Sequence, residues 1–369
     1  MSEIAVEVVP GAVDIGPAWN DLAERAEVNV FQHPAGTNAV SATGYGQTYT
    51  LLARRHGRLV GLWTFEETKM GPFRFLNGLP HRYAFIAGPV IDRDHTDAVV
   101  SAFFAAFASD PSLPKVLHAR FLDGGQTAWH ALASVPGTRR RAILFQRQRA
   151  FLTRDAGAKR SGSTRKKMRQ DWNRLAAQGE IAIVNDRDPS AARRAFETFL
   201  AIEAKSWKGE EGTAILSRPD DARFIRRWFA DLAEAGAASV ALLTLDGKPI
   251  AAQVLLSAGN TAYTWKIGYD AAWEKFSPGV LLIDKLSEQL LEAGIEQIES
   301  CSPQGGFMEK VWSGRRWTGE ILFEFGDRPT LSYPAVMLAA RGYETLRAVY
   351  HRAKAWRSPA RAPKIAPAN

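Results

Sequence analysis

The 369-residue chain is poor in several features that would each point to a particular class of protein. It contains a single cysteine, Cys301, which excludes an intrachain disulfide and a multi-cysteine metal cluster and fits a reducing compartment. No stretch approaches ~18 uninterrupted apolar residues, so a membrane-spanning helix is not expected. The N-terminal segment lacks the basic and apolar regions of a secretory signal peptide. These absences together predict a cytoplasmic protein.

Several well-defined catalytic motifs are absent as well. The seven histidines are scattered and form no HExxH motif, so we expect no metal site. There is neither a Walker phosphate loop nor the glycine fingerprint of a dinucleotide-binding fold. No histidine lies near Cys301 in the sequence to activate its thiol as a nucleophile. What remains is an ordinary globular composition, 46% hydrophobic and 23% charged, at a length that predicts two domains.

The net charge of +8 is distributed unevenly along the chain. Residues 139–174, here called the basic belt, hold 13 Lys and Arg against Asp155 and Asp171, a net charge of +11. Residues 341–364 hold seven basic residues against Glu344, a net charge of +6, so the remainder carries 8 − 11 − 6 = −9. Such fields attract polyanions, which makes transfer RNA or an anionic membrane surface a candidate partner of the basic belt. Solvated charge with no dedicated partner is the alternative.

Two segments far apart in the sequence follow one pattern. LLARRHGRLVGL at 51–62 and LLTLDGKPIAAQ at 242–253 each predict a β-hairpin with a glycine-containing turn, a basic residue and an aliphatic pair. The elements around the two hairpins also follow a similar order, which predicts a duplicated domain. Periodicity and capping residues predict strands at 4–9, 47–55, 58–65, 115–120, 143–153, 181–184, 239–245, 250–257, 261–269, 295–300 and 319–325, and helices starting near 17, 94, 127, 163, 189, 219, 278 and 333.

The predicted fold class is therefore α+β, with two tandem domains at 1–153 and 154–330. Each is expected to be a mixed, mostly antiparallel sheet flanked by helices. Residues 331–369 are expected to form a C-terminal helix followed by a basic tail.

The stretch 261–294 carries the clearest signal of a binding site. A β-rich segment is followed by Ser277-Pro278-Gly279, which predicts a capping hydroxyl, a proline at the first helical position and a residue without a side chain. Leucines then recur at helical spacing up to Gly294, which is placed as a C-cap glycine. The free amides at such a helix start favour an anion, most often a phosphate. An ordinary helix start in a packed domain is the alternative.

The C-terminal half resembles the GNAT acyltransferases, in particular the bacterial acetyltransferase domains associated with cellulose biosynthesis and the related Fem-type aminoacyl transferases with two GNAT units. The resemblance rests on SGSTRKKMRQDWNRLAAQGEI (161–181), FLAIEAKSWKGEEGTAI (199–215), LDGKPIAAQ (245–253), YTWKIGYDAAWEKFSPGVLL (263–282) and FMEKVW (307–312). The phosphate loop departs from the better-known GNAT form, since Glu274 to Gly279 contains one glycine and a proline. The N-terminal half resembles the family only in the order of its elements.

The resemblance implies two GNAT-like domains and an acyl-CoA donor. The strand edge at Trp265, Lys266 and Ile267 is expected to bind the pantetheine arm, and the segment of Ser277, Pro278, Gly279, Val280 and Leu281 is expected to bind the pyrophosphate. Acyl transfer also needs a group that takes a proton from the acceptor. Glu203 is the first candidate, with an ion pair to Lys205, Lys208 or an arginine of the basic belt as the alternative. Asp270 is the second, with loop capping as the alternative.

The acceptor is expected to contact Trp207, Lys208, Tyr269 and Lys310. Three functions remain open at this stage. The first is transfer of an acyl group, in particular acetyl, from acyl-CoA to an amine or hydroxyl of a small molecule, sugar or cell-envelope precursor. The second is aminoacyl-tRNA-dependent transfer of Fem type, although no heptad-patterned arm for tRNA interrupts the chain. The third is a non-catalytic GNAT scaffold that binds a polyanion.

Overall fold

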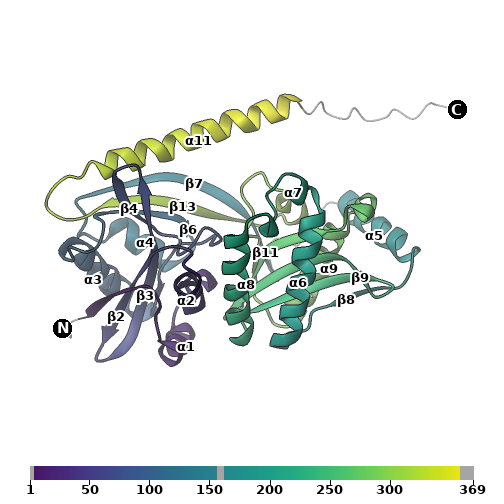
Figure 1. The fold of residues 1–369 in the computed structure, drawn as a ribbon, viewed down its shortest axis with the longest axis horizontal. Coiled ribbons are helices and arrows are strands. Elements are labelled where there is room, and N and C mark those ends of the chain that lie inside the picture. The colour runs from purple at the N-terminus through teal and green to yellow at the C-terminus, as the bar shows by residue number, and fades with distance from the viewer. Residues whose placement is uncertain (1–3, 156–161, 358–369) are drawn as a thin grey trace.

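The computed structural model describes residues 4–155 and 162–357 (Figure 1). Its strands run side by side in the order β1-β2-β3-β4-β6-β13-β7-β12-β11-β10-β9-β8, and β5 pairs with β3. The strands are β1 (Ala5–Pro10), β2 (Thr48–Arg55), β3 (Arg58–Met70), β4 (Phe73–Asn77), β5 (Val90–Ile91), β6 (Val116–Asp123), β7 (Arg140–Thr153), β8 (Ile181–Val184), β9 (Ala238–Leu245), β10 (Lys248–Ala258), β11 (Thr261–Tyr269), β12 (Gln297–Glu299) and β13 (Arg315–Glu324).

Helices flank this continuous sheet in both halves, and one long helix ends the described chain (Figure 1). The α-helices are α1 (Gly16–Arg25), α2 (Pro34–Thr43), α3 (Thr96–Ser109), α4 (Thr127–Ser134), α5 (Gly162–Ala176), α6 (Pro189–Lys205), α7 (Trp207–Glu210), α8 (Pro219–Glu234), α9 (Pro278–Glu292), α10 (Met308–Val311) and α11 (Ser332–Arg357), and the short 3-10 helices are η1 (Val30–Gln32), η2 (Arg93–His95), η3 (Ile215–Ser217) and η4 (Ala271–Phe276).

The two predicted hairpins occupy equivalent places in the two halves. The turn between β2 and β3 has positive φ at His56 and Gly57, and the turn between β9 and β10 has positive φ at Asp246 and Gly247. Two successive left-handed residues suit a tight hairpin turn, where glycine costs least. In the first half the order is β1-β2-β3-β4, and in the second it is β8-β9-β10-β11. This correspondence matches the duplication that the sequence predicts.

Strands β7 and β13 join the halves. Residues 140–150 of β7 pair with β13, whereas residues 151–153 pair with β12 of the second half. Strand β13, which comes late in the chain, also pairs with β6 and so lies inside the sheet of the first half. The boundaries at 153 and 330 therefore remain a prediction. Strand β7, before residue 153, extends into the sheet of the second half, and β13, after residue 153, lies in the sheet of the first half.

The second half buries both faces of its sheet. The apolar face of α8, with Phe224, Trp228 and Leu232, belongs to a large core that continues into the first half. The opposite face packs against α9, where Leu282 and Leu286 are buried in a separate cluster. Helical spacing of these apolar residues is what directs each helix onto its face.

The structure adds elements that the sequence patterns did not predict. Helix α2 is mostly buried although its sequence, PAGTNAVSAT, has no pronounced helical pattern of apolar residues. Strand β12 covers only three residues of the predicted strand at 295–300. The terminal helix predicted at 333–356 is present as α11, and the basic tail from 358 lies outside the described residues. Within the described ranges, none of the helices has the length and apolar character needed to span a bilayer.

Candidate active site

The centre of the candidate site is the edge of β11 that faces β12. Strand β11 pairs with β10 over most of its length, but it pairs with β12 only through residues 261–263. From Thr264 to Tyr269 no strand in the described part of the chain pairs with this edge. An edge without a partner strand suits an extended ligand, which would add to the sheet as a further strand.

A β-bulge changes which side chains reach this edge. Val254 pairs with Lys266 and Leu255 with Thr264, so Trp265 is the extra residue. The indole Nε1 of Trp265 donates to the carbonyl of Tyr83 at 3.0 Å, and the Lys266 ammonium lies 5.4 Å from the centre of the Tyr83 ring. Regular alternation places Trp265 and Lys266 on opposite faces of the strand. That expectation is wrong, because the bulge lets both contact Tyr83.

Glu203 lies beside this edge and has no exposed surface. Its Oε1 accepts from the Nζ of Lys208 at 3.1 Å and lies 3.9 Å from the Nζ of Lys266. Its Oε2 accepts from the backbone amide of Ile215 at 3.0 Å. Lys208 also donates to the carbonyl of Ile267, on β11 itself, at 3.2 Å. The carboxylate and the two ammonium groups therefore form one buried charge cluster at the strand edge, and the ion pair kept open as an alternative for Glu203 is present.

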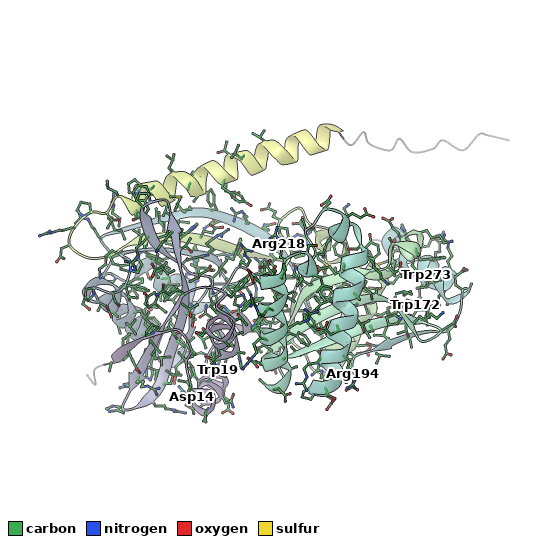
Figure 2. All side chains as sticks on the ribbon, in the orientation of Figure 1. Asp14, Trp19, Trp172, Arg194, Arg218 and Trp273 are labelled. Carbon is green, nitrogen blue, oxygen red and sulfur yellow. The ribbon has the colours of Figure 1, made fainter. Side chains whose placement is uncertain are left out.

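The first half of the chain contributes directly to this region. Asp221, in the first turn of α8, accepts from the hydroxyl of Tyr45 at 2.5 Å and from that of Tyr83 at 2.6 Å. Arg82 lies 3.2 Å from the same carboxylate and Arg218 lies 3.8 Å from it. Arg218 is labelled in Figure 2, where α8 meets the first half. Tyr83 thus bonds to Asp221 through its hydroxyl and to Trp265 through its carbonyl.

The environment shifts the pKa of the central groups. Burial lowers the pKa of Lys266, the Lys208 charge lowers it further, and the charges of Glu203 and Asp221 oppose that shift. Burial raises the pKa of Asp221, but the hydrogen bonds from Tyr45 and Tyr83 outweigh it and leave the pKa below its usual value. Perturbed groups of this kind gather at functional sites more often than elsewhere.

The start of α9 lies at the end of β11, as expected, but its details differ. Ser277 adopts a left-handed conformation with φ of 54°, and its side chain makes no capping bond, so the predicted hydroxyl cap is wrong. The Ser277 carbonyl instead accepts from the amides of Val280 at 2.9 Å and Leu281 at 3.2 Å. The amides of Val280 and Leu281 are therefore both used inside the helix, which contradicts the expected role of these two residues in binding the pyrophosphate. The Leu281 side chain is buried in the core. Gly279 packs against Ile267, where an added Cβ would lie 3.3 Å from Cδ1.

The remaining predicted residues lie around this centre with different contacts. Asp270 accepts from the amide of Ala272 at 2.9 Å and so caps η4, which was its alternative role. Burial raises the pKa of Tyr269, with the nearby Glu274 adding to the shift. Lys310 is exposed on α10, and the side chain of Trp207 lies outside what the structure describes. The roles of Asp270, Tyr269, Lys310 and Trp207 remain predictions.

A pocket of about 300 Å³ opens next to the site, between the first half and the loop after β12. Its wall includes four arginines and no carboxylate. Arg82 links this pocket to Asp221, and the Nε of Arg120 is buried without a hydrogen-bond partner among the described residues. The arginines are Arg82, Arg120, Arg147 and Arg149. We call this the arginine pocket. Each of its arginines also pairs with a carboxylate outside the lining, namely Asp221, Glu320 or Glu299. An anionic group of a ligand would therefore share these guanidinium groups with carboxylates of the protein.

Much of the basic belt is neutralised within the fold. Arg140 pairs with Glu324, and Arg147 pairs with Glu320, at 2.6 Å each. These arginines lie in β7, whereas the second part of the belt forms α5, where Lys166 is exposed. The belt is therefore not one continuous surface, and a polyanion partner for it remains a prediction that now applies chiefly to α5.

Burial leaves Cys301 inert. Its thiol lies in the core, and burial raises its pKa well above the usual value.

Among the described residues, no group of three or more His, Cys, Asp and Glu side chains is arranged to hold a metal ion.

Comparison with known proteins connects this geometry to a family. Residues 162–304 match the family model of the acetyltransferase (GNAT) domain. The C-terminal half is thus similar to a GNAT domain. The matching region runs from α5 to the loop after β12, so it includes the free edge of β11, Glu203 and the start of α9. No curated protein matches the chain.

Solved structures extend the likeness to both halves. The crystal structure of FemX has a TM-score of 0.59 and 12% identity, covering 89% of this chain and 99% of that chain. L-PGS from Bacillus licheniformis has a TM-score of 0.55 and 15% identity, covering 89% and 96%. The C-terminal domain of a putative lysylphosphatidylglycerol synthetase from Agrobacterium fabrum has a TM-score of 0.54 and 16% identity, covering 87% and 96%. The fold is thus of GNAT type with a Fem-type resemblance, which confirms the predicted fold class, and the domain match supports acyl transfer.

Sequence patterns alone did not identify Tyr45, Arg82, Tyr83 and Asp221 as part of the site. No motif marks the two tyrosines, which lie 176 and 138 residues from their partner. One signal does exist for Asp221. It precedes Ile225 and Trp228 at helical spacing, so it is an acidic residue on the apolar face of α8.

Proposed function

We propose that this protein transfers an acyl group, in particular acetyl, from acyl-CoA to an amine or hydroxyl of a small molecule, sugar or cell-envelope precursor. The observation that carries the proposal is the free edge of β11 beyond Tyr263, with the buried Glu203 beside it. An extended pantetheine arm fits such an edge because its amides can bond to the strand backbone. The GNAT domain match covers these same residues.

Each part of the site has a chemical role in this proposal. The edge at Trp265 and Ile267 aligns the thioester, and the amide of Gly279, at the helix start, faces the phosphates together with the helix dipole. The acceptor nitrogen or oxygen attacks the thioester carbonyl carbon and the carbon–sulfur bond breaks. The sulfur leaves as a thiolate, and the proton that the acceptor loses balances its conversion to the CoA thiol. Glu203 takes the acceptor proton once Lys208 releases its carboxylate. The ammonium of Lys266 supplies positive charge for the oxyanion that develops.

The arginine pocket supports an acceptor that carries an anionic group. It lies next to the Asp221 cluster, and Arg82 belongs to both. A phosphate or carboxylate on the acceptor would pair with these guanidinium groups and hold the nucleophile toward β11. Sugar phosphates and cell-envelope precursors have this character.

Binding and turnover of acetyl-CoA test the proposal. Acetyl-CoA at ~100 times its dissociation constant should stabilise the protein by about 2.7 kcal/mol, seen as a rise in melting temperature. Turnover can be measured without knowledge of the acceptor as hydrolysis of the thioester, which is detected through the released CoA thiol. The variant Gly279→Asp adds a negative charge at the start of α9, beside Ile267 and Tyr269, and should abolish the stabilisation. Gly279→Ala is the matched control, since its methyl group contacts Ile267 without adding charge. Normal CoA binding by Gly279→Asp would place the donor elsewhere.

Transfer from aminoacyl-tRNA is the second candidate. The observation in its favour is the fold likeness over both halves to FemX and to a putative lysylphosphatidylglycerol synthetase. A rise in melting temperature with aminoacyl-tRNA, combined with none at millimolar acetyl-CoA, would favour this donor. Absence of both shifts and of hydrolysis would favour a non-catalytic scaffold.

A further inference from the structure

Helix α11 presents large apolar side chains to solvent. The described chain has nine exposed large hydrophobic residues, and five of them lie between 331 and 349. Leu338 and Leu346 are 74% and 71% exposed, and Val349 is 57% exposed. Spacings of eight and three residues put these three side chains on one side of the helix. In Figure 1 no other described element lies on the outer side of α11. An apolar stripe of this kind marks a surface that binds a partner.

The opposite side of the helix is anchored to the sheet. Tyr333 and Val336 are buried against Val116 and Leu322, and the Arg140 guanidinium lies 4.3 Å from the centre of the Tyr333 ring. Glu344 further along pairs with Arg147 of β7 at 2.5 Å. The outward stripe is therefore not a core face that has come away from its partner.

The charge of α11 indicates the chemistry of what covers the stripe. Residues 332–357 include five basic residues, Arg341, Arg347, Arg352, Lys354 and Arg357, and a single acidic residue. That acidic residue, Glu344, pairs with Arg147 of β7, and Arg341 is exposed. A helix with an apolar stripe and an excess of Lys and Arg is typical of one that lies in the interface of an anionic bilayer.

We propose that α11 docks the protein on an anionic lipid surface, with Leu338, Leu346 and Val349 inserted at the level of the headgroups. A second copy of the chain fits less well, because pairing two such helices would bring their basic residues together. Nucleic acid fits less well, because phosphate contacts do not require an aliphatic stripe. The proposal is separate from the acyl transfer site, because the residues that it uses lie on α11 and none of them lies near β11.

Flotation of the full chain with lipid vesicles tests the proposal. We expect binding to vesicles that contain phosphatidylglycerol and little binding to vesicles of phosphatidylcholine alone. The triple variant Leu338→Ser, Leu346→Ser and Val349→Ser should bind at least about tenfold more weakly, because each apolar side chain contributes to insertion. The control is Val184→Ser, which removes an exposed apolar residue from β8, 48% exposed in the wild type.

A charge variant separates the two contributions. Arg341→Glu keeps the stripe and should reduce the preference for phosphatidylglycerol, with a weaker effect as salt concentration rises. Equal flotation of the wild type and the triple variant would overturn the proposal, and so would equal binding to both kinds of vesicle. A dimer in sedimentation that the triple variant abolishes would instead identify a second copy as the occupant. Thioester hydrolysis in solution should be unchanged in every one of these variants, which keeps this test distinct from that of the proposed function.

Discussion

The substitution Glu203→Gln addresses the centre of the candidate site most directly. It keeps the shape of the side chain and removes its charge. The wild-type carboxylate is fully buried, 3.1 Å from the Lys208 ammonium and 3.9 Å from that of Lys266. Removing one partner of a buried ion pair costs roughly 3–5 kcal/mol, because the other charge is left uncompensated. The two lysine side chains retain 23% and 19% exposure, so we expect a smaller loss of about 2–3 kcal/mol in the free energy of unfolding.

The same variant should lose turnover by more than its stability explains. If Glu203 takes the acceptor proton, thioester hydrolysis at a temperature where the variant is folded should fall by roughly 10²–10⁴. The rise in melting temperature with acetyl-CoA should remain, because Glu203 is placed beside the strand edge and not at the start of α9. The pKa of Lys266 should also fall further, since the Glu203 charge opposes the effect of burial there.

Glu197→Gln is the matched control. Glu197 lies on the same helix, but it is 54% exposed and pairs with Arg226 at the surface. Exposed pairs contribute only about 0–1 kcal/mol, so this variant should behave as the wild type. Unchanged turnover in Glu203→Gln together with lost stability would refute the proton-transfer role and leave a structural ion pair. Unchanged stability would refute the reasoning about the charge cluster itself.

Three further substitutions test other parts of the structure. Burial raises the pKa of Glu320, but the hydrogen bond and charge of His118 and the charge of Arg120 outweigh it and lower the pKa from 4.5 to about 2. Glu320→Gln should therefore cost about 3 kcal/mol at neutral pH in urea unfolding, and this difference should shrink as pH falls from about 4.5 to about 2, because a carboxyl with a depressed pKa stabilises the fold only while it is ionised. Asp221→Asn should lose about 2 kcal/mol, because the two tyrosine hydroxyls donate to different oxygens of Asp221 and one of these becomes an NH2 group that cannot accept; an unchanged urea midpoint would count against the cluster. Arg120→Ala should weaken stabilisation by inorganic phosphate, measured by melting temperature, if the arginine pocket binds anions.

Local chemistry accounts for the parts of the fold that could be predicted from the sequence. The turn at Asp246-Gly247 needs two left-handed residues, and Asp-Gly supplies them at low cost. The start of α9 is marked by Pro278, and its end by Gly294, whose φ is 95°. The position of each of these elements depends on residues that are neighbours in the sequence, so the sequence pattern is sufficient to predict it.

The candidate site could be predicted only in part, because its geometry depends on contacts between distant segments. The apolar neighbours Phe199 and Leu200, one turn away, indicate that Glu203 is buried, and the pair with Lys208 was among its predicted alternatives. The approach of Lys266 was not predicted, because it comes from β11, far from Glu203 in the sequence. The bulge at Trp265 depends on the register in which β10 pairs with β11. The alternation of side chains along β11 alone does not predict it. Ser277 was predicted to cap α9 through its hydroxyl. Its backbone is left-handed instead, and its carbonyl oxygen accepts hydrogen bonds from the amides of Val280 and Leu281.

The exchange of strands explains why the first half belongs to the site although the family match begins at residue 162. Strand β13 pairs with β6 and β7, and the end of β7 pairs with β12. Backbone hydrogen bonds therefore fix the two halves of the sheet relative to each other. That fixed relation is what brings Tyr83 against both Asp221 and Trp265. A GNAT-type strand edge is therefore completed on one side by residues of the other half. Tyr83 and Arg82 of the first half therefore contact Asp221 of the second half beside this strand edge.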